Sequence, residues 1–412
     1  MLQRFIDNTF YLLLLFTLVF GVIFYDSTKY FSFIDELCAI ALCGLYLYYV
    51  LHTPNWSVNK LFLATLGVFS FYLVYSLAIH CNTKAAIISD FIIQIKPYLA
   101  FFTVYALAPQ LNKQMKKNCQ FLSIVFSGYL LLIGLTNLFD DTILTILLHH
   151  PSRLATASTI LAMLYLYCSE YSRKDKVIFL ALLSIGILSG RTKAYGFFVI
   201  SAFIIYYIND RFELKFNFKN SAIFLAVLGV ITIVAWEKIN LYFIQGGFGG
   251  GREANDLYAR MALYYFSTFV IMDYFPFGSG FATYATFTSG KYYSAVYNRY
   301  GMDILYGLTE KDPRFIADTY YPALAQFGII GVILFFTFWI VLTKKALRLF
   351  DPKLNTHQFV ITILIIGFFL IECTSDATIT HNRGLFMMML LALALKGLKS
   401  HSKQEPYESI NC

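Results

Sequence analysis

The chain has 412 residues, of which 58% are hydrophobic and only 14% are charged. Soluble proteins carry about 25% charged residues, so this composition excludes an ordinary soluble enzyme. The formal net charge of +8 would suit a nucleic-acid partner. The basic residues are, however, placed where they would set the orientation of the chain in a membrane. The seven cysteines are scattered and predict neither a zinc site nor a disulfide framework.

Apolar runs of about 17–25 residues, and some shorter tilted ones, are long enough to cross a bilayer. Twelve such runs cover residues 9–25, 37–51, 61–80, 88–108, 121–138, 154–168, 177–188, 194–208, 221–239, 320–343, 359–373 and 384–395. The first run lacks a cleavage site of the Ala-x-Ala kind, so we expect an uncleaved first helix. The sequence therefore predicts an all-α integral membrane protein with about 12 spanning helices.

Basic residues gather in alternate loops between these runs, and one side collects 18 of the 32 Lys and Arg residues. They are Arg4, Lys60, Lys113, Lys116, Lys117, Arg173, Lys174, Lys176, Arg211, Lys215, Lys219, Lys344, Lys345, Arg348, Lys353, Lys396, Lys399 and Lys403. Cytoplasmic loops of membrane proteins carry this excess of positive charge. We therefore expect both termini in the cytoplasm.

Residues 241–315 form the only long stretch without a spanning run, and they include a glycine-rich run at 246–251. The alternation of loops places this stretch on the outward side, in the periplasm or at the cell exterior. The predicted organisation is then nine spanning helices in 1–240, a large periplasmic loop with an amphipathic helix in 241–315, three spanning helices in 316–397, and a cytoplasmic tail in 398–412. Loops on a rigid scaffold commonly carry function.

Arg191 stands in a five-residue outward turn at 189–193, between two apolar runs. A guanidinium at this boundary matches a phosphate group bidentately and stays charged where hydration is poor. An arginine that merely extends to the membrane interface is the alternative interpretation. Further mixed charges stand at outward helix ends, whereas Lys96 lies deeper within its run. Charged groups at such positions are candidates for function.

Several short motifs follow Arg191 in a definite order. They are Ser189 with Arg191, then Arg260, then Pro276 with Gly278 and Gly280, then Asp318, then Gly328 with Gly331. Because these motifs occur in this order around the large loop, the chain resembles the superfamily of O-antigen ligases and O-antigen polymerases. About 145 residues carry the motifs, and each motif alone is weak, because a Gly-x-Gly is usually a turn and a Gly-x-x-Gly usually a site of close packing.

The resemblance implies a GT-C-like glycosyltransferase of the bacterial inner membrane, with its large loop in the periplasm, that uses no cofactor and no metal ion. Its substrate would be an oligosaccharide linked through pyrophosphate to a polyprenyl lipid, and its partners a chain-length regulator and a flippase. Arg191 and Arg260 would stabilise the leaving pyrophosphate, which needs positive charge. The other residues expected to bind substrate are Gly278, Gly280, Tyr258, Tyr292 and Arg383.

Two residues are candidates for the general base, Asp318 and His381. Where ligases of the superfamily have His-Asn, this chain has Asp318 followed by Thr319, which favours a polymerase over a ligase. A buried carboxylate can act as a base when its pKa is raised. Asp318 would equally suit the N-cap of the following helix. His381, at another outward helix end, is the rival base.

A polysaccharide-lipid transporter is the competing class of function. Transporters commonly show internal repeats and charges at mid-depth in broken helices. The two halves of this chain show no clear repeat, and apart from Lys96 its charges cluster near the ends of the runs. The sequence therefore favours a glycosyltransferase, with a ligase as the nearer alternative and a transporter as the more distant one.

Overall fold

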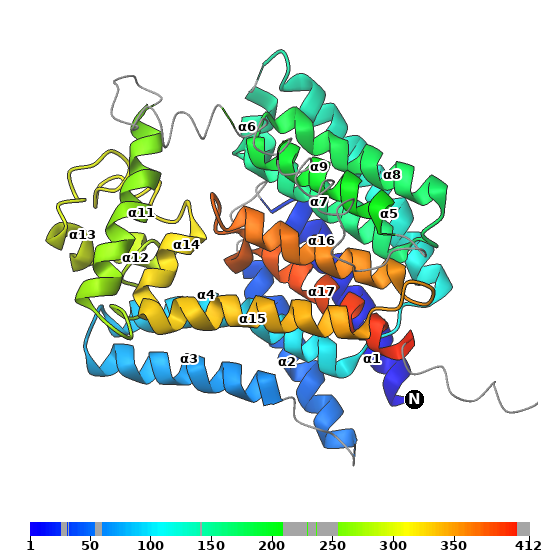
Figure 1. Ribbon diagram of the computed structural model, residues 1–412, viewed down its shortest axis with the longest axis horizontal. Coiled ribbons are helices and arrows are strands. Elements are labelled where there is room, and N and C mark those ends of the chain that lie inside the picture. The colour runs from blue at the N-terminus through cyan, green and yellow to red at the C-terminus, as the bar shows by residue number, and fades with distance from the viewer. Residues whose placement is uncertain are drawn as a thin grey trace, which may run out of the picture.

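The computed structural model describes residues 1–25, 31, 33–53, 60–140, 142–208, 229, 236 and 254–401, with the backbone alone at 254–258 and 400–401. These residues form helices and turns, with no strand among them (Figure 1). This confirms the predicted all-α class. Most of the predicted span at 221–239, the glycine run at 246–251 and nearly all of the tail lie outside the described residues.

Helices occupy the other predicted spans. In chain order they are α1 (Leu2–Phe16) with its π-helical continuation η1 (Thr17–Ile23), α2 (Ile34–His52), α3 (Lys60–Ala78), α4 (Lys84–Leu107), α5 (Lys113–Thr136), the short α6 (Thr142–Leu148), α7 (Pro151–Cys168), α8 (Arg173–Ser184) with η3 (Ile185–Ser189), and α9 (Thr192–Tyr207). After the large loop come α14 (Tyr320–Ala323), η5 (Leu324–Phe327), α15 (Gly328–Leu349), α16 (Thr356–Glu372), η6 (Thr378–Thr380) and α17 (Asn382–His401).

Six helical segments of the described chain are long and apolar enough to cross a bilayer. They are Leu2–Ile23, Ile34–His52, Lys60–Ala78, Lys84–Leu107, Lys113–Thr136 and Tyr320–Leu349. Thr192–Tyr207 and Thr356–Glu372 are apolar but shorter. The chain is therefore a helical protein with several candidate membrane spans, and the total of twelve stays a prediction.

Local capping residues set where several helices begin. The Thr83 hydroxyl accepts the Ala86 N–H at 3.3 Å in front of α4, and the Asn112 side chain accepts the Met115 N–H at 2.9 Å in front of α5. Ser172 and Asp175 form a reciprocal capping box at the start of α8. Such side chains satisfy amide groups that have no partner within the helix. Polar residues between the apolar runs thus fix the helix boundaries.

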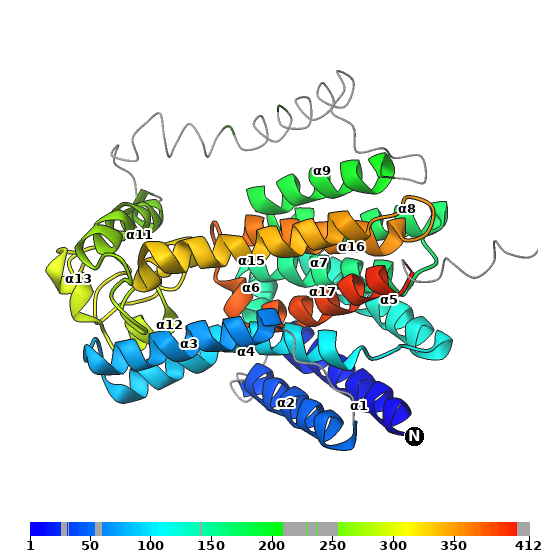
Figure 2. The same ribbon diagram turned by 60° about the horizontal axis from the view of Figure 1, so that its bottom comes forward.

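The centre of the bundle is formed by α17, which packs against α4, α7, α16 and η1. Its methionines 387–389 are fully buried, as is typical of a helix surrounded by other helices. In Figure 2, α2 and α9 lie on opposite sides of the bundle, with α7 and α17 between them. The turn that precedes α17 is consequently enclosed by several other helix ends.

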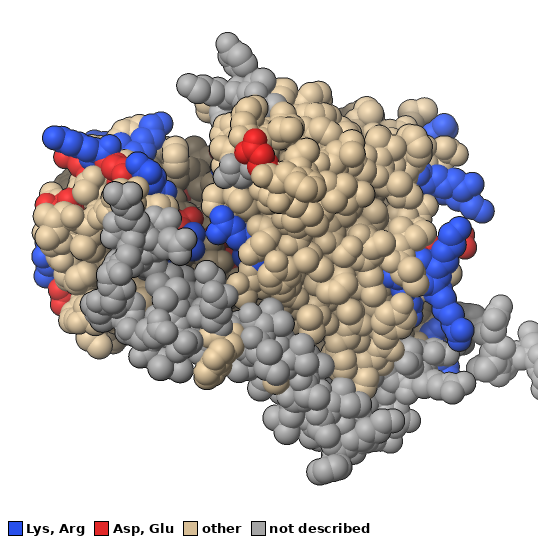
Figure 3. Space-filling view, turned by 90° about the horizontal axis from the view of Figure 1, so that it is seen from above, with Lys and Arg blue, Asp and Glu red and all other residues tan. Residues whose placement is uncertain are grey.

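The described basic loops share one end of the molecule. The Gln110 N–H donates to the Asp7 carboxylate at 2.9 Å, which joins the N-terminus to the connection after α4. Lys345 of α15 and Lys396 of α17 both stand over the Tyr105 ring, at 4.2 and 5.2 Å from its centroid. Figure 3 shows Lys and Arg gathered at this end, and a largely uncharged surface separates them from the opposite end.

At the opposite end, the large loop folds into a lobe (Figure 1). It contains α11 (Ala254–Asp273), α12 (Phe287–Lys291) and α13 (Ala295–Arg299). The lobe has its own apolar core, which includes the fully buried rings of Tyr284 and Tyr297. The predicted amphipathic helix at 258–272 falls within α11. An aromatic-rich loop can therefore build a rigid second unit next to the helical bundle.

A glycine junction joins the lobe to the start of α15. The backbone of Gly278, at φ +79°, lies so close to Gly328, at φ +60°, that a Cβ on Gly278 would stand 2.2 Å from the Gly328 nitrogen. The Gly280 N–H also donates to the Gln326 carbonyl at 2.8 Å. Glycine alone permits this approach and these positive φ angles. Two motifs that are distant in the sequence thus pack directly against each other.

Candidate active site

Arg191 lies at the junction between η3 and α9. The preceding Gly190 adopts φ +65°, and the Ser189 hydroxyl accepts the Arg191 N–H at 3.3 Å, so the turn is tightly defined. The guanidinium Nη2 lies 3.0 Å from Nε2 of His150 at the start of α7. Burial, reinforced by the Arg191 charge, lowers the pKa of His150 to about 4. The imidazole is therefore neutral at neutral pH and can accept a hydrogen bond from Arg191.

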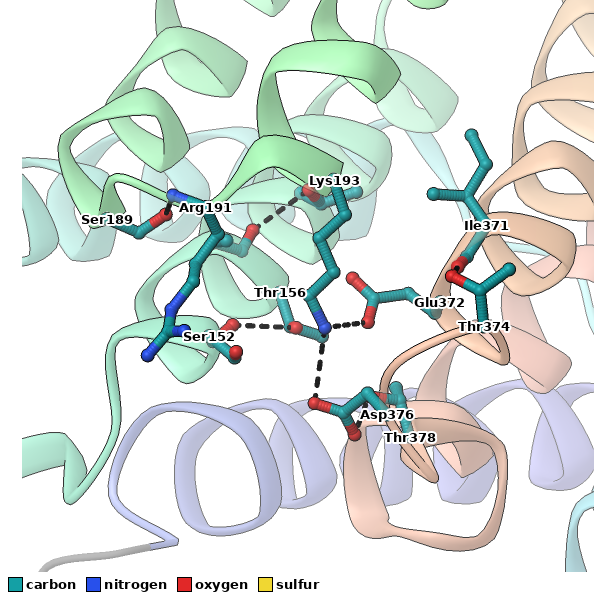
Figure 4. A network of polar contacts seen from close by, with 12 residues as sticks. Ser152, Thr156, Ser189, Arg191, Lys193, Ile371, Glu372, Thr374, Asp376 and Thr378 are labelled. Carbon is teal, nitrogen blue, oxygen red and sulfur yellow. Dashed lines mark hydrogen bonds and ion pairs between the residues drawn. The ribbon is translucent and has the colours of Figure 1, made fainter. Parts of the chain in front are cut away.

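Lys193, two residues further along, lies in a buried ion-pair network (Figure 4). Its Nζ donates to Glu372 at 2.5 Å and to Asp376 at 3.2 Å. The side chains of Lys193 and Glu372 are only 9% and 7% exposed. A charge buried to this extent is tolerated when it is paired and hydrogen-bonded. Lys193 therefore ties the start of α9 to the end of α16.

Arg260 and Asp318 form an ion pair at the edge of the lobe. Both Nε and Nη2 of the Arg260 guanidinium approach Oδ2 of Asp318. The two side chains are 23% and 26% exposed, so water reaches this pair. Burial raises the pKa of the Asp318 carboxyl, and the Arg260 charge opposes the rise. Two residues that the sequence motifs single out separately are thus direct partners.

The predicted N-cap role of Asp318 is wrong. The next helix, α14, begins at Tyr320, and its N-cap position is Thr319, which makes no side-chain capping hydrogen bond. The Asp318 carboxylate instead turns towards Arg260. A capping contact would offer the carboxylate one neutral N–H donor, whereas the guanidinium offers two N–H donors and a full opposite charge.

A backbone clamp holds Asp318 near the Lys193 network. The N–H groups of Tyr320 and Tyr321 both lie 3.2 Å from the Cys373 carbonyl, immediately after Glu372. The Tyr320 hydroxyl also donates to Gln94 of α4 at 3.0 Å. These bonds fix the segment that carries Asp318 against the turn between α16 and α17.

That turn contributes Asp376 and His381. Burial tends to raise the pKa of Asp376, but the charges of Lys193 and His381 and a hydrogen bond from Thr378 together lower it to about 2. Burial lowers the pKa of His381 to about 4, and Asp376 only partly opposes this. His381 nevertheless keeps an exposed surface. The imidazole is therefore neutral at neutral pH, and part of its surface is open to solvent.

The structure brings these groups together at one place. Arg191, Lys193, Arg260 and Asp376 all act electrostatically on the pKa of His150. Figure 3 shows Lys, Arg, Asp and Glu side chains in the hollow between the lobe and the helical bundle. Asp376 also acts on Asp318 and on His381. The predicted residues Arg191, Arg260, Asp318 and His381 therefore belong to one charged cluster, which we call the outer pocket. Its other members are His150, Lys193, Glu372 and Asp376.

Other predicted substrate-binding residues have different surroundings. Gly278 and Gly280 lie in the glycine junction, and the Tyr75 hydroxyl donates to the Gly278 carbonyl at 2.9 Å. The carbonyl of Tyr292, just after α12, accepts from Asn82 at 3.0 Å. The side chain of Tyr258 lies outside the described residues, although its backbone is in α11, two positions before Arg260. The substrate-binding role of these four residues stays a prediction.

Arg383 lies at the start of α17, two residues after His381. It is 6% exposed, and its Nη2 donates to the Val22 carbonyl at 3.2 Å. Its guanidinium carbon is also 5.7 Å from the centre of the Tyr25 ring. Arg383 thus borders the outer pocket from the side of η1 and α17, away from the lobe.

Sequence reasoning missed the ion pair between Lys193 and Glu372. These residues are 179 positions apart, and no motif links them. One signal was present, because Glu372 is a carboxylate within the apolar run 359–373, where an ionisable group is costly without a partner. Nothing in the sequence showed that the partner would be Lys193 rather than another cation.

Within the described ranges, no group of three or more His, Cys, Asp and Glu residues is arranged to hold a metal ion. Comparisons of the chain with protein-family models and with curated protein sequences gave no match. The case for a function therefore depends on the chemistry of the outer pocket and on the order of the motifs that build it.

Proposed function

We propose that this protein is a membrane glycosyltransferase that polymerises polyprenyl-pyrophosphate-linked oligosaccharide units into a surface polysaccharide, an O-antigen or a capsule. It would act at the periplasmic face of a bacterial inner membrane. The observation that carries the proposal is the convergence of Arg191, Lys193 and Arg260 with Asp318 and His381 in a solvent-reached hollow. This hollow lies at the end opposite to the basic loops (Figure 3).

The reaction needs these groups. An acceptor sugar hydroxyl attacks the anomeric carbon of the donor, and the bond from that carbon to the phosphate oxygen breaks. The lipid pyrophosphate leaves with the bonding electron pair and gains negative charge, which fixed cations stabilise. Arg191 and Arg260 are well suited to this task because a planar guanidinium binds phosphate oxygens in pairs. They would fill the place that a divalent cation has in many other glycosyltransferases.

The proton of the acceptor hydroxyl must pass to a base. Asp318 is engaged by Arg260, so part of its capacity to accept a proton is already in use. His381 is neutral and partly accessible, and Asp376 stabilises the imidazolium that forms after proton transfer. An incoming pyrophosphate would raise the pKa of His381 further towards neutrality. We therefore favour His381 as the general base and Asp318 as the group that orients Arg260.

The decisive experiment incubates the purified protein in lipid vesicles with a lipid-linked repeat unit alone. A polymerase forms a ladder of longer glycans that remain lipid-linked, and it releases one polyprenyl pyrophosphate for each unit joined. A ligase makes no ladder and transfers glycan only when a lipid A-core acceptor is added. A transporter forms no new glycosidic bond under either condition, and that result would refute the proposal.

A further inference from the structure

A second group of cations borders the outer pocket. Arg153 in the first turn of α7 and Arg383 in the first turn of α17 both lie against Tyr25, which follows η1. The guanidinium carbons are 5.9 and 5.7 Å from the centre of that ring. Cation–π contacts of this kind hold arginine side chains in defined positions. Three segments that are distant in the sequence thus fix two guanidinium groups around one tyrosine.

Asp376 links this second group to the first group. Asp376 is bound by Lys193 at 3.2 Å, and it also attracts both Arg153 and Arg383. Both arginines act on His381, the favoured base. The two cationic groups come from different elements. Lys193 and Arg260 belong to α9 and α11, whereas Arg153 and Arg383 belong to α7 and α17. The favoured base therefore lies next to the second group, and Asp376 connects it to Lys193 of the first group.

The charge balance leaves room for anions. Among the described residues, Arg153, Arg191, Lys193, Arg260 and Arg383 are opposed by Asp318, Glu372 and Asp376. The ion pairs of Lys96 with Asp35 and Glu36 also act on His381 and Tyr25, so six cations face five carboxylates in all. Arg153 and Arg383 also repel each other and lie in the first turns of helices, where the helix dipole adds positive potential. A region with this excess favours ligands that carry several negative charges.

We propose that Arg153, Arg383 and Tyr25 form a second pyrophosphate subsite, which holds the acceptor substrate while Arg191, Lys193 and Arg260 hold the donor. This inference rests on the proposed polymerase function. In polymerisation both substrates are lipid-linked pyrophosphates in the same membrane leaflet, so both head groups need cations at the same end of the protein. The donor pyrophosphate leaves with the electron pair of the broken bond, and the acceptor pyrophosphate stays intact in the product. A ligase needs only the first subsite.

Native mass spectrometry can count the bound head groups. The probe is polyprenyl pyrophosphate without glycan, and parallel arms use phosphatidylglycerol and inorganic pyrophosphate to separate lipid-linked pyrophosphate from a general anionic lipid and from the free anion. We expect two polyprenyl pyrophosphates per wild-type chain. Arg153→Gln and Arg191→Gln should each weaken one of them by about 10- to 100-fold, as expected for the loss of charge-assisted hydrogen bonds.

Two further variants serve as controls for the loss of a positive charge and for the geometry of the guanidinium group. Arg348→Gln removes an exposed arginine at the basic end of α15 and should still bind two. Arg153→Lys keeps the charge without the planar fork, so it should bind the second lipid with intermediate affinity. Arg153 is preferred to the buried Arg383 because its side chain is partly exposed, and replacing it disturbs packing less.

The outcomes separate the two proposals. One bound lipid per wild-type chain, lost on replacing either arginine, would mean a single extended site and would overturn the second subsite alone. Two bound lipids that Arg153→Gln leaves unaffected would overturn it as well, as would equal binding of phosphatidylglycerol. If the wild-type chain bound no polyprenyl pyrophosphate at all, the proposed function itself would fail.

Discussion

At the scale of single residues, the proposed reaction needs positive charge next to the leaving pyrophosphate, and two guanidinium groups of the outer pocket would supply it. Arg191 is presented by a tight turn and contacts His150, while Arg260 is held by Asp318. Both guanidinium groups are thus oriented before substrate arrives. Preorganised charges of this kind need little rearrangement in the transition state, which is why they contribute strongly to catalysis.

Replacing either arginine should therefore reduce turnover sharply. We expect Arg191→Ala and Arg260→Ala each to lower kcat/KM for polymerisation by about 100-fold or more, because each removes about 2–3 kcal/mol of charge-assisted hydrogen bonding. The measurement is the rate of ladder formation by purified protein in vesicles. Arg348→Ala, at the basic end, is the matched control and should keep wild-type activity. Normal chain formation in both pocket variants would show that these arginines bind no pyrophosphate.

The pH dependence should report the pKa of the free enzyme's base. The pKa of His381 is lowered to about 4, so kcat/KM should stay constant from neutral pH downwards and decline only as pH falls through about 4. His381→Gln should abolish activity, whereas Asp318→Asn should retain part of it. A decline centred near pH 6.5 would instead indicate an imidazole whose pKa the pocket does not perturb.

Arg153 offers a way to identify which residue titrates. Its charge lowers the pKa of His381, whereas the main influences on Asp318 are burial, Arg260, Asp376 and Lys193. Arg153→Gln should therefore move the acidic limb of the pH profile to higher pH if His381 is the base. An unchanged limb would point to Asp318 instead.

The residues of this pocket were predictable to different degrees. Arg191, Asp318 and His381 stand near the ends of apolar runs, and Arg260 lies in the large loop between two of them, so the sequence alone marks these four charged residues as candidates. The contact between Arg191 and His150 and the burial of Lys193 depend on how helices pack across the bundle. Tertiary packing of this kind leaves no periodic or local signal in the chain.

At the scale of elements, the glycine junction sets how the lobe meets α15. The backbones of Gly278 and Gly328 approach so closely that no side chain fits between them. The sequence motifs mark both glycines but assign Gly278 to substrate binding. Their contacts point to a structural role, because positioning the lobe also positions Arg260 relative to Arg191.

The junction can be tested with a matched pair of substitutions. Gly278→Ala introduces a Cβ at 2.2 Å from the Gly328 nitrogen, whereas Gly301 has a similar φ of +64° with nothing within 4 Å of an added Cβ. Gly301→Ala should cost about 1 kcal/mol for its backbone conformation, and Gly278→Ala about 2–4 kcal/mol more from overpacking. Thermal unfolding in detergent measures both. Equal losses of stability would mean that the junction is looser than these contacts indicate.

At the scale of the whole molecule, the apolar runs predicted where helices would lie, because burial in lipid requires long hydrophobic segments. The same reasoning could not foresee that the large loop forms a lobe with its own core. Tyr284 and Tyr297 are fully buried there, and in a sequence such tyrosines are indistinguishable from those of an interfacial belt. Aromatic content alone therefore does not separate a folded lobe from a flexible loop.

The proposed function requires the lobe and the basic loops to lie on opposite sides of the membrane, and cysteine labelling can test this. In a variant without native cysteines, Asn298→Cys in α13 and Lys353→Cys after α15 both place a thiol at an exposed position. Positive-inside topology predicts that a membrane-impermeant maleimide labels position 298 once only the outer membrane is opened, and position 353 only after the inner membrane is disrupted. The reverse pattern would put the outer pocket in the cytoplasm, where it could not act on periplasmic glycans, and the polymerase proposal would have to be abandoned.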